Sequence, residues 1–264
     1  MEKCMSPDTP LILYGTPLSQ PVRAVIWLLL SKRKAFDLVL INPGSEGEKG
    51  SRSEEFLSKN PGGTIPLLEE PSANFFLAEA HAILAYLCQK YRWFDLYPEE
   101  AKSRAKVDWY LHSHHRGARD ASLAFFAPNV RKDLKFPDDV IRMSVAIFNR
   151  HLKSIESGWL ASSNYLTGDQ VSIADIAAYV DIGQLRPRFT NLFNFDLFPN
   201  ISRWMESMER LDMHDEAHAG LINLGDISRN SPDKQSVIAA NKYGYEVIHR
   251  TKSNYSNLKT IDPA

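Results

Sequence analysis

The chain has 264 residues, enough for one large or two modest domains. Its formal net charge of −1 creates no bulk field that would attract nucleic acid or an anionic membrane. The two cysteines, Cys4 and Cys88, are too far apart to form a disulfide framework, which favours a reducing compartment. The N-terminus has no apolar signal-peptide core, and the longest uninterrupted apolar run, 24–30, is too short to span a bilayer. We therefore expect a cytoplasmic protein.

The first predicted elements are a short apolar strand, 11–15, and a helix that runs through 26–30. Ser19 lies between them, at the positive end of the helix, where backbone N–H groups have no intrahelical partner. Pro21 falls in the first turn, where a missing N–H does no harm. Such a position suits an anion, for example a thiolate. The alternative is that Ser19 only caps the helix, which is worth about 1 kcal/mol.

Two further segments complete a predicted order of strand, helix, strand, helix, strand, strand, helix. Residues 60–69 predict a helix end, a turn and a strand start, with Pro66 at the beginning of that strand, where proline is tolerated. Residues 75–80 predict a strand that leads into a helix over 82–87. The sequence therefore predicts an α+β domain in this part of the chain.

In order and spacing, these segments resemble the thioredoxin-like N-terminal domain of the cytosolic glutathione transferases. The run Leu18-Ser19-Gln20-Pro21 is most similar to the theta class and its serine-using relatives. The resemblance covers residues 10–211. It implies that the Ser19 hydroxyl hydrogen-bonds the glutathione sulfur, and that the Ile65–Pro66 bond corresponds to the cis-proline of the family.

The resemblance also implies a glutathione site. The backbone of Ile65 would pair with the cysteinyl unit, Thr64 would lie near the glycine end, and Gln20 would assist near the γ-glutamyl group. Glu79 would accept a hydrogen bond from the α-amino group. Ala80 departs from the family, which has a serine or threonine hydroxyl there. The missing hydroxyl would weaken glutathione binding by about 1 kcal/mol, or by up to about 3 kcal/mol for a charged acceptor.

The loop over 47–53 lacks the histidine that the theta class often carries there. Lys49 and Arg52 are cations in this loop, and either has the reach to bind the glycine carboxylate of glutathione. The alternative is that both are solvated loop charges.

After a linker near 91–98 the periodicity is helical. One long helix is predicted over 101–124, an amphipathic helix over 140–156 and a further helix over 201–211. Ser172 and Asp175 predict a reciprocal capping arrangement at the start of a further helix.

From about residue 212 the apolar residues thin out. The pattern favours one more helix over 236–250 and a short helix over 213–222. Several glutathione transferase classes cover the site with a C-terminal helix. The alternatives are that this extension packs on the helical domain or stays mobile. The expected organisation is a thioredoxin-like βαβαββα domain over 1–92, with 1–9 disordered, and an all-α domain over 99–264.

An electrophile pocket is expected between the two domains, facing the first long helix. The candidates for its lining are Leu18, Tyr110, His114, Arg119 and Phe126. The alternative for each is a core or interface role. The histidines over 112–115 do not supply the three or four ligands that zinc requires, so we expect no metal. No cofactor is expected apart from glutathione as co-substrate.

The sequence thus predicts a glutathione transferase that transfers glutathione to small hydrophobic electrophiles, in a detoxification role and as a homodimer. Ser19 stands where a thioredoxin has a nucleophilic cysteine, and Cys-x-x-Cys is absent, which argues against thiol–disulfide exchange. The alternative, favoured by Ala80, is a catalytically weak ligand-binding or protein-interaction module. The sequence does not identify the electrophile.

Overall fold

The computed structural model describes residues 10–258. The predicted N-terminal order is confirmed, and a short 3-10 turn, Pro71–Ala73, joins the last two strands. The elements are β1 (Leu11–Gly15), α1 (Gln20–Ser31), β2 (Phe36–Leu40), α2 (Glu54–Lys59), β3 (Leu67–Glu70), β4 (Phe75–Ala78) and α3 (Ala80–Lys90). The disorder predicted for 1–9, and Cys4 with it, lies outside the described residues.

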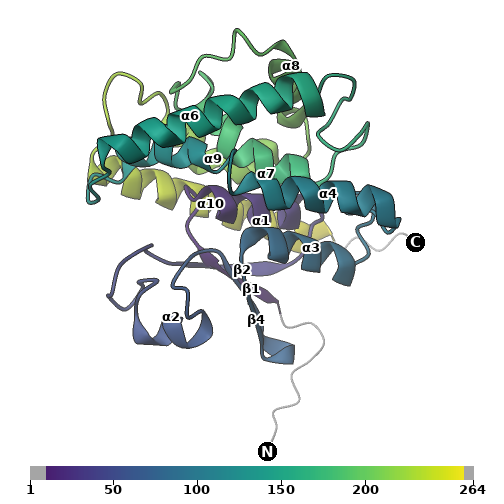
Figure 1. Ribbon diagram of the computed structural model, residues 1–264. Coiled ribbons are helices and arrows are strands. Elements are labelled where there is room, and N and C mark those ends of the chain that lie inside the picture. The colour runs from purple at the N-terminus through teal and green to yellow at the C-terminus, as the bar shows by residue number, and fades with distance from the viewer. Residues whose placement is uncertain (1–9, 259–264) are drawn as a thin grey trace, which may run out of the picture.

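The four strands form one sheet in the order β2-β1-β3-β4. β1 pairs parallel with β2 and antiparallel with β3, and β3 pairs antiparallel with β4. Successive residues of a strand point to opposite faces. Leu11 and Leu13 accordingly face the main core, whereas Tyr14 joins a smaller cluster with Phe56 of α2. α1 and α3 cover one face of the sheet, and α2 covers the other (Figure 1).

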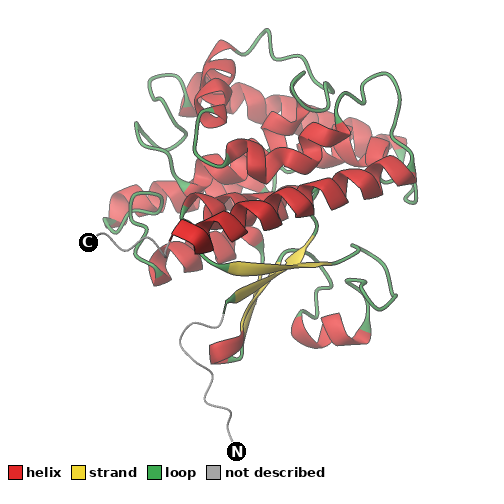
Figure 2. Ribbon diagram, turned by 180° about the vertical axis from the view of Figure 1, so that it is seen from behind, coloured by secondary structure: helices red, strands yellow, loops and turns green. Residues whose placement is uncertain are grey.

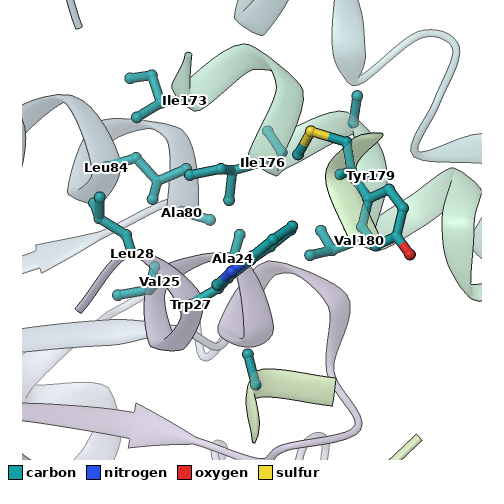
Figure 3. Packing of buried hydrophobic residues seen from close by; sticks show 14 of the residues in the cluster. Ala24, Val25, Trp27, Leu28, Ala80, Leu84, Ile173, Ile176, Tyr179 and Val180 are labelled. Atoms are coloured by element: carbon teal, nitrogen blue, oxygen red, sulfur yellow. The ribbon is translucent and has the colours of Figure 1, made fainter. Parts of the chain in front are cut away.

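The apolar run 24–30 makes α1 hydrophobic on all sides, which is typical of a helix without a solvent face. Every residue of α1 from Val22 to Leu30 is buried. Figure 3 shows how α1 packs between α3 and α7, with side chains from the three helices interleaved. The labelled residues are Ala24, Val25, Trp27, Leu28, Ala80, Leu84, Ile173, Ile176, Tyr179 and Val180.

The second half of the chain is helical, as predicted, and forms the upper layer in Figure 1. Its α-helices are α4 (Ala101–His114), α5 (Ala127–Val130), α6 (Asp138–Ser154), α7 (Ile173–Ile182), α8 (Pro199–Glu209), α9 (His214–Leu224) and α10 (Lys234–Leu258). Within the described part of the chain, no helix is long and apolar enough to cross a bilayer.

The helix predicted over 101–124 is wrong in its second half. α4 ends at His114, a turn follows, and a π-helical segment runs over Ser122–Phe126. Gly117 lies in the turn against α6, where a Cβ would come within 2.3 Å of His151 Nδ1. This close approach between segments distant in sequence leaves no signal in the helical periodicity.

The capping arrangement predicted for Ser172 and Asp175 is confirmed at the start of α7. The Ser172 side chain accepts from a backbone N–H in the first turn of the helix, and the Asp175 carboxylate accepts from the backbone N–H of Ser172. Asp175 is fully buried, and its carboxylate also accepts from the backbone N–H of Leu166 and from Nε1 of Trp204. The box therefore ties α7 to a preceding loop and to α8.

The C-terminal extension is helical, and α10 is longer than predicted. It crosses the front of Figure 2 above the strands and packs on α9. Near its end, Lys252 donates to the carbonyl of Phe36 and Tyr255 donates to that of Leu30. The extension thus packs on α9 of the helical domain and on α1 and β2 of the N-terminal domain.

Candidate functional site

A cavity of about 240 Å³ lies between the two domains. The N-terminal domain contributes the segment before β3, the start of α3 and one side of α1. The helical domain contributes the end of α4, the turn after it and α7. The lining residues are Pro21, Ala24, Thr64, Ile65, Pro66, Glu79, Ala80, His81, His114, His115, Arg119, Ala177, Val180 and Asp181.

The segment before β3 is shaped by a side-chain amide and a cis peptide bond. Asn60 Nδ2 donates to the carbonyl of Thr64 at 2.8 Å, and Asn60 Oδ1 accepts from the N–H of Gly62 at 3.1 Å. The Ile65–Pro66 bond is cis. This turn presents Thr64, Ile65 and Pro66 together to the cavity.

The two cations of the 47–53 loop lie in different places. A Cβ on Gly63 would come within 2.9 Å of Arg52 Nη1, so the Arg52 guanidinium lies on the turn that carries Thr64. Lys49 lines a separate hollow of about 180 Å³ together with residues from β1 and α2. Of the two, Arg52 is the cation beside the cavity segment.

The turn into α3 places a carboxylate and a small side chain on the cavity wall. Glu79 is exposed and has φ +69° and ψ 112°, a conformation that residues other than glycine seldom adopt. Such outliers cluster at binding and active sites. Ala80 follows as the first residue of α3 and is 7% exposed. Because Ala80 has no hydroxyl, its backbone N–H is the hydrogen-bond donor that it offers to a ligand at the start of α3.

Ser19 is the N-cap residue of α1, with extended backbone angles of φ −73° and ψ 124°. Its hydroxyl makes no capping hydrogen bond, so it is not committed to the helix end. Ser19 is half-buried and does not itself line the cavity, whereas Pro21 in the first turn of α1 does. Ser19 therefore lies directly before the turn of α1 that reaches the cavity wall.

A polar network joins the domains beside α1. Asp181 is buried on α7, and its carboxylate lies 3.0 Å from Arg119 Nη1 and 3.0 Å from His114 Nε2. Arg119 Nη1 also donates to Gln20 Oε1 at 3.1 Å, and Gln20 Nε2 donates to Gln184 Oε1 at 3.1 Å. Burial alone would raise the pKa of Asp181, but Arg119 and His114 hold this pKa below its usual value.

Sequence reasoning missed Asp181. The signal was present, because Asp181 is an acid near the end of a helix whose other residues after Asp175 are apolar or aromatic. A carboxylate on such a helix is buried and needs a cationic or hydrogen-bonding partner. Arg119, expected in the pocket, is that partner.

Three residues expected in the electrophile pocket lie elsewhere. Leu18, Tyr110 and Phe126 are buried in the main hydrophobic core and do not line the cavity. Tyr110 packs edge-on against Trp159, with ring centroids 5.4 Å apart. Their apolar surface is already covered by the chain itself, which leaves His114 and Arg119 as the cavity-lining members of that set.

Three imidazoles meet on the cavity wall. The His81 ring centroid lies 4.7 Å from that of His114 and 4.8 Å from that of His115. Burial, reinforced by the two neighbouring rings, lowers the pKa of His81 to about 3. No group of three or more His, Cys, Asp or Glu side chains in residues 10–258 is arranged to hold a metal ion. His81 is therefore a neutral polar group of the wall at physiological pH.

The depressed pKa of His81 predicts a loss of stability in acid. Unfolded His81 binds its proton at the ordinary pKa of 6.5, whereas the folded protein resists it down to about 3. The unfolded state thus binds more protons between these values, and the free energy of unfolding falls as the pH drops from 6.5. His81 accounts for about 2 kcal/mol of this loss at pH 5.

Urea titrations of the wild type and His81→Asn at pH 7 and pH 5 check this prediction. The variant should lose less stability on acidification. His112→Asn is the control, because His112 is exposed on α4 and its ring meets solvent in both states. Equal losses in the wild type and His81→Asn would contradict the assignment.

Comparison with known proteins identifies the two halves of the chain. Residues 13–99 match the family described as "Glutathione S-transferase, N-terminal domain", and residues 138–207 match "Glutathione S-transferase, C-terminal domain". The glutathione S-transferase theta-1 of Homo sapiens is 29% identical over 229 residues, which cover 83% of this chain and 92% of the relative. The theta-1 protein of Mus musculus is 28% identical over 223 residues, covering 81% and 90% respectively.

Solved structures agree with this match. Human glutathione S-transferase T1-1 in its apo form superposes with a TM-score of 0.70 at 25% identity, covering 90% of this chain and 99% of the other. Human glutathione transferase theta-2, solved with glutathione, has the same fold, with a TM-score of 0.69 at 24% identity and coverages of 91% and 99%. The sequence matches, the thioredoxin-like sheet and the helical second domain together show that this chain belongs to the glutathione transferase family and is similar to its theta class.

Proposed function

We propose that this protein is a glutathione transferase in which the Ser19 hydroxyl donates a hydrogen bond to the thiolate of bound glutathione. The observation that carries the proposal is the uncommitted Ser19 hydroxyl at the N-terminus of α1. Two features support it. The cavity-lining segments 64–66 and 79–81 lie beside the first turn of α1, and the relatives include theta-class glutathione S-transferases.

The chemistry follows from the position of Ser19. The thiol of glutathione is almost entirely protonated at neutral pH, and the thiolate is the nucleophile. A donor hydrogen bond and the positive end of α1 both favour the anion. Each unit by which they lower the thiol pKa corresponds to about 1.4 kcal/mol. The sulfur then attacks the electrophilic carbon, and the leaving group departs with the bonding electron pair. Ser19 acts as a donor and never as a nucleophile.

Glutathione is proposed to lie along the N-terminal side of the cavity. Backbone groups of Ile65 pair with its cysteinyl unit, and Glu79 accepts from its α-amino group. Arg52, beside the Thr64 turn, is the better-placed cation for the glycine carboxylate, whereas Lys49 lies in the separate hollow. The opposite wall, formed by α7 and the turn after α4, receives the electrophile.

The electrophile is proposed to be a small hydrophobic molecule. Ala177 and Val180 of α7 give the cavity an apolar side, while His114 and Arg119 give it a polar one. Glutathione is a co-substrate, and the reaction uses no other cofactor and no metal. This chemistry fits a role in detoxification.

A homodimer with a twofold interface and a cytoplasmic location complete the proposal. Phe75 and Phe76 of β4 point to opposite sides, toward Tyr86 and toward the Phe56 cluster, and both stay partly exposed, which leaves part of their surface for a partner. The buried thiol of Cys88, whose pKa is raised to about 12 by burial, is inert and fits a reducing compartment.

The Ser19→Ala variant tests the thiolate assignment. The variant should fold, because the hydroxyl does not cap α1. Turnover near neutral pH should fall about tenfold or more and recover partly at alkaline pH, where glutathione ionises without help. The measurement is the pH–rate profile of glutathione conjugation. A profile superimposable on that of the wild type would refute the role of Ser19.

The Ala80→Ser variant tests the glutathione-binding wall. A hydroxyl at the first residue of α3 would face the γ-glutamyl carboxylate and lower the KM for glutathione about tenfold, the equivalent of one additional hydrogen bond to a charged group. Ala82→Ser, exposed on the same helix, is the matched control. If both variants leave KM unchanged, the γ-glutamyl group does not bind at this turn.

A further inference from the structure

The C-terminal helix α10 holds the loop that carries Ser19. Asn241 of α10 accepts at Oδ1 from the Thr16 hydroxyl, at 2.5 Å, and from the backbone N–H of Leu18, at 3.0 Å. The Leu18 N–H can only donate, so it fixes which end of the Asn241 amide faces the loop. The Asn241 Nδ2 group in turn donates to Val237 within α10. This contact joins residues more than two hundred positions apart in the sequence.

Two glycines bring α10 close enough for this contact. A Cβ on Gly244 would lie 2.8 Å from the Pro17 Cβ and 3.1 Å from the Cα of Gly220 in α9. A Cβ on Gly220 would lie 2.9 Å from the carbonyl oxygen of Ala240. Pro17 therefore fits where α9 and α10 touch, in a space that exists only because both positions lack a side chain.

The other side of the Leu18 peptide is also held by the helical domain. The Leu18 carbonyl accepts from Arg23 Nη1 at 2.7 Å. Arg23 is fully buried, and its Nη2 donates to the Val180 carbonyl and to Gln184 Oε1. The N–H of Leu18 is thus bound by Asn241 of α10. The Leu18 carbonyl is bound by Arg23, which α7 and the turn after it hold in place.

We propose that Asn241 is a positioning residue for the Ser19 hydroxyl, so that the C-terminal extension forms part of the catalytic apparatus. No residue of α9 or α10 lines the cavity described above. The extension acts instead through the Thr16–Leu18 loop, which sets where α1 begins and where Ser19 points. This inference rests on the proposed role of Ser19 in stabilising the glutathione thiolate.

The test compares two variants of the full chain that each remove one tie between α10 and the N-terminal domain. Asn241→Ala removes the acceptor of the loop, and Tyr255→Phe removes the hydrogen bond to the Leu30 carbonyl at the other end of α10. Asn241→Ala should lower kcat near neutral pH about tenfold and raise the pKa of the bound glutathione thiol, read from its ultraviolet absorbance. The KM for glutathione should change less. Tyr255→Phe should match the wild type in all three.

A double-mutant cycle separates positioning from general destabilisation. In a Ser19→Ala background, Asn241→Ala should have little further effect, because the group that it positions is gone. Equal losses in both backgrounds would overturn the proposal. If Ser19→Ala itself leaves the pH profile unchanged, the proposed function of Ser19 fails instead, so the two failures are distinguishable.

A second variant tests the proposal without removing Asn241. Gly244→Ala introduces a Cβ against Pro17 and shifts the loop while leaving the amide in place. It should raise the pKa of the bound thiol in the same direction as Asn241→Ala. A folded Gly244→Ala protein with the thiol pKa of the wild type would overturn the proposal, even if Asn241→Ala does not fold.

Discussion

The burial of α1 on every side is the constraint on which the rest of the structure depends. The sheet lies on one side of this helix, and α3, α7 and α9 enclose the others, so both domains share a single core around it. Interiors of this kind are packed as closely as crystals and move little. The N-terminal end of α1, where Ser19 lies, is therefore placed by the helical domain as much as by the sheet that precedes it.

The polar groups beside α1 restrict how the two domains can pack around this shared core. Arg23 is fully buried, and burial lowers the pKa of its guanidinium to about 10, yet three acceptors hold it in place. Asp181 is buried as well, and it binds Arg119 and His114 at the cavity edge. Removing one partner from such a pair leaves an uncompensated charge and is strongly destabilising. The network thus fixes one relative placement of the domains and one shape of the cavity between them.

Local patterns in the sequence predicted the elements whose causes are local. The apolar run of α1, the short apolar segment of β1 and the capping box at Ser172 all follow from side-chain pattern or from neighbours a few residues apart. The end of α4 was predicted wrongly: Gly117 lies three residues after His114, and its close approach to His151 of α6 is a tertiary contact that the periodicity does not reveal. The partners of Asp181 and the contact between Asn241 and Leu18 likewise arise only from tertiary packing. Of the expected residues, His114 and Arg119 on the helical wall and the segments 64–66 and 79–80 line the cavity. Gln20, expected near the γ-glutamyl group, is instead buried in the network with Arg119 and Gln184.

The central claim is that the N-terminus of α1 and the Ser19 hydroxyl together favour the glutathione thiolate. Its most direct test is a spectroscopic titration of glutathione bound to the wild-type protein, following the ultraviolet absorbance of the thiolate as the pH is raised. The account predicts a pKa at least about one unit below that of free glutathione, the equivalent of about 1.4 kcal/mol of preference for the anion. A bound thiol that titrates at the same pH as glutathione in solution would contradict it.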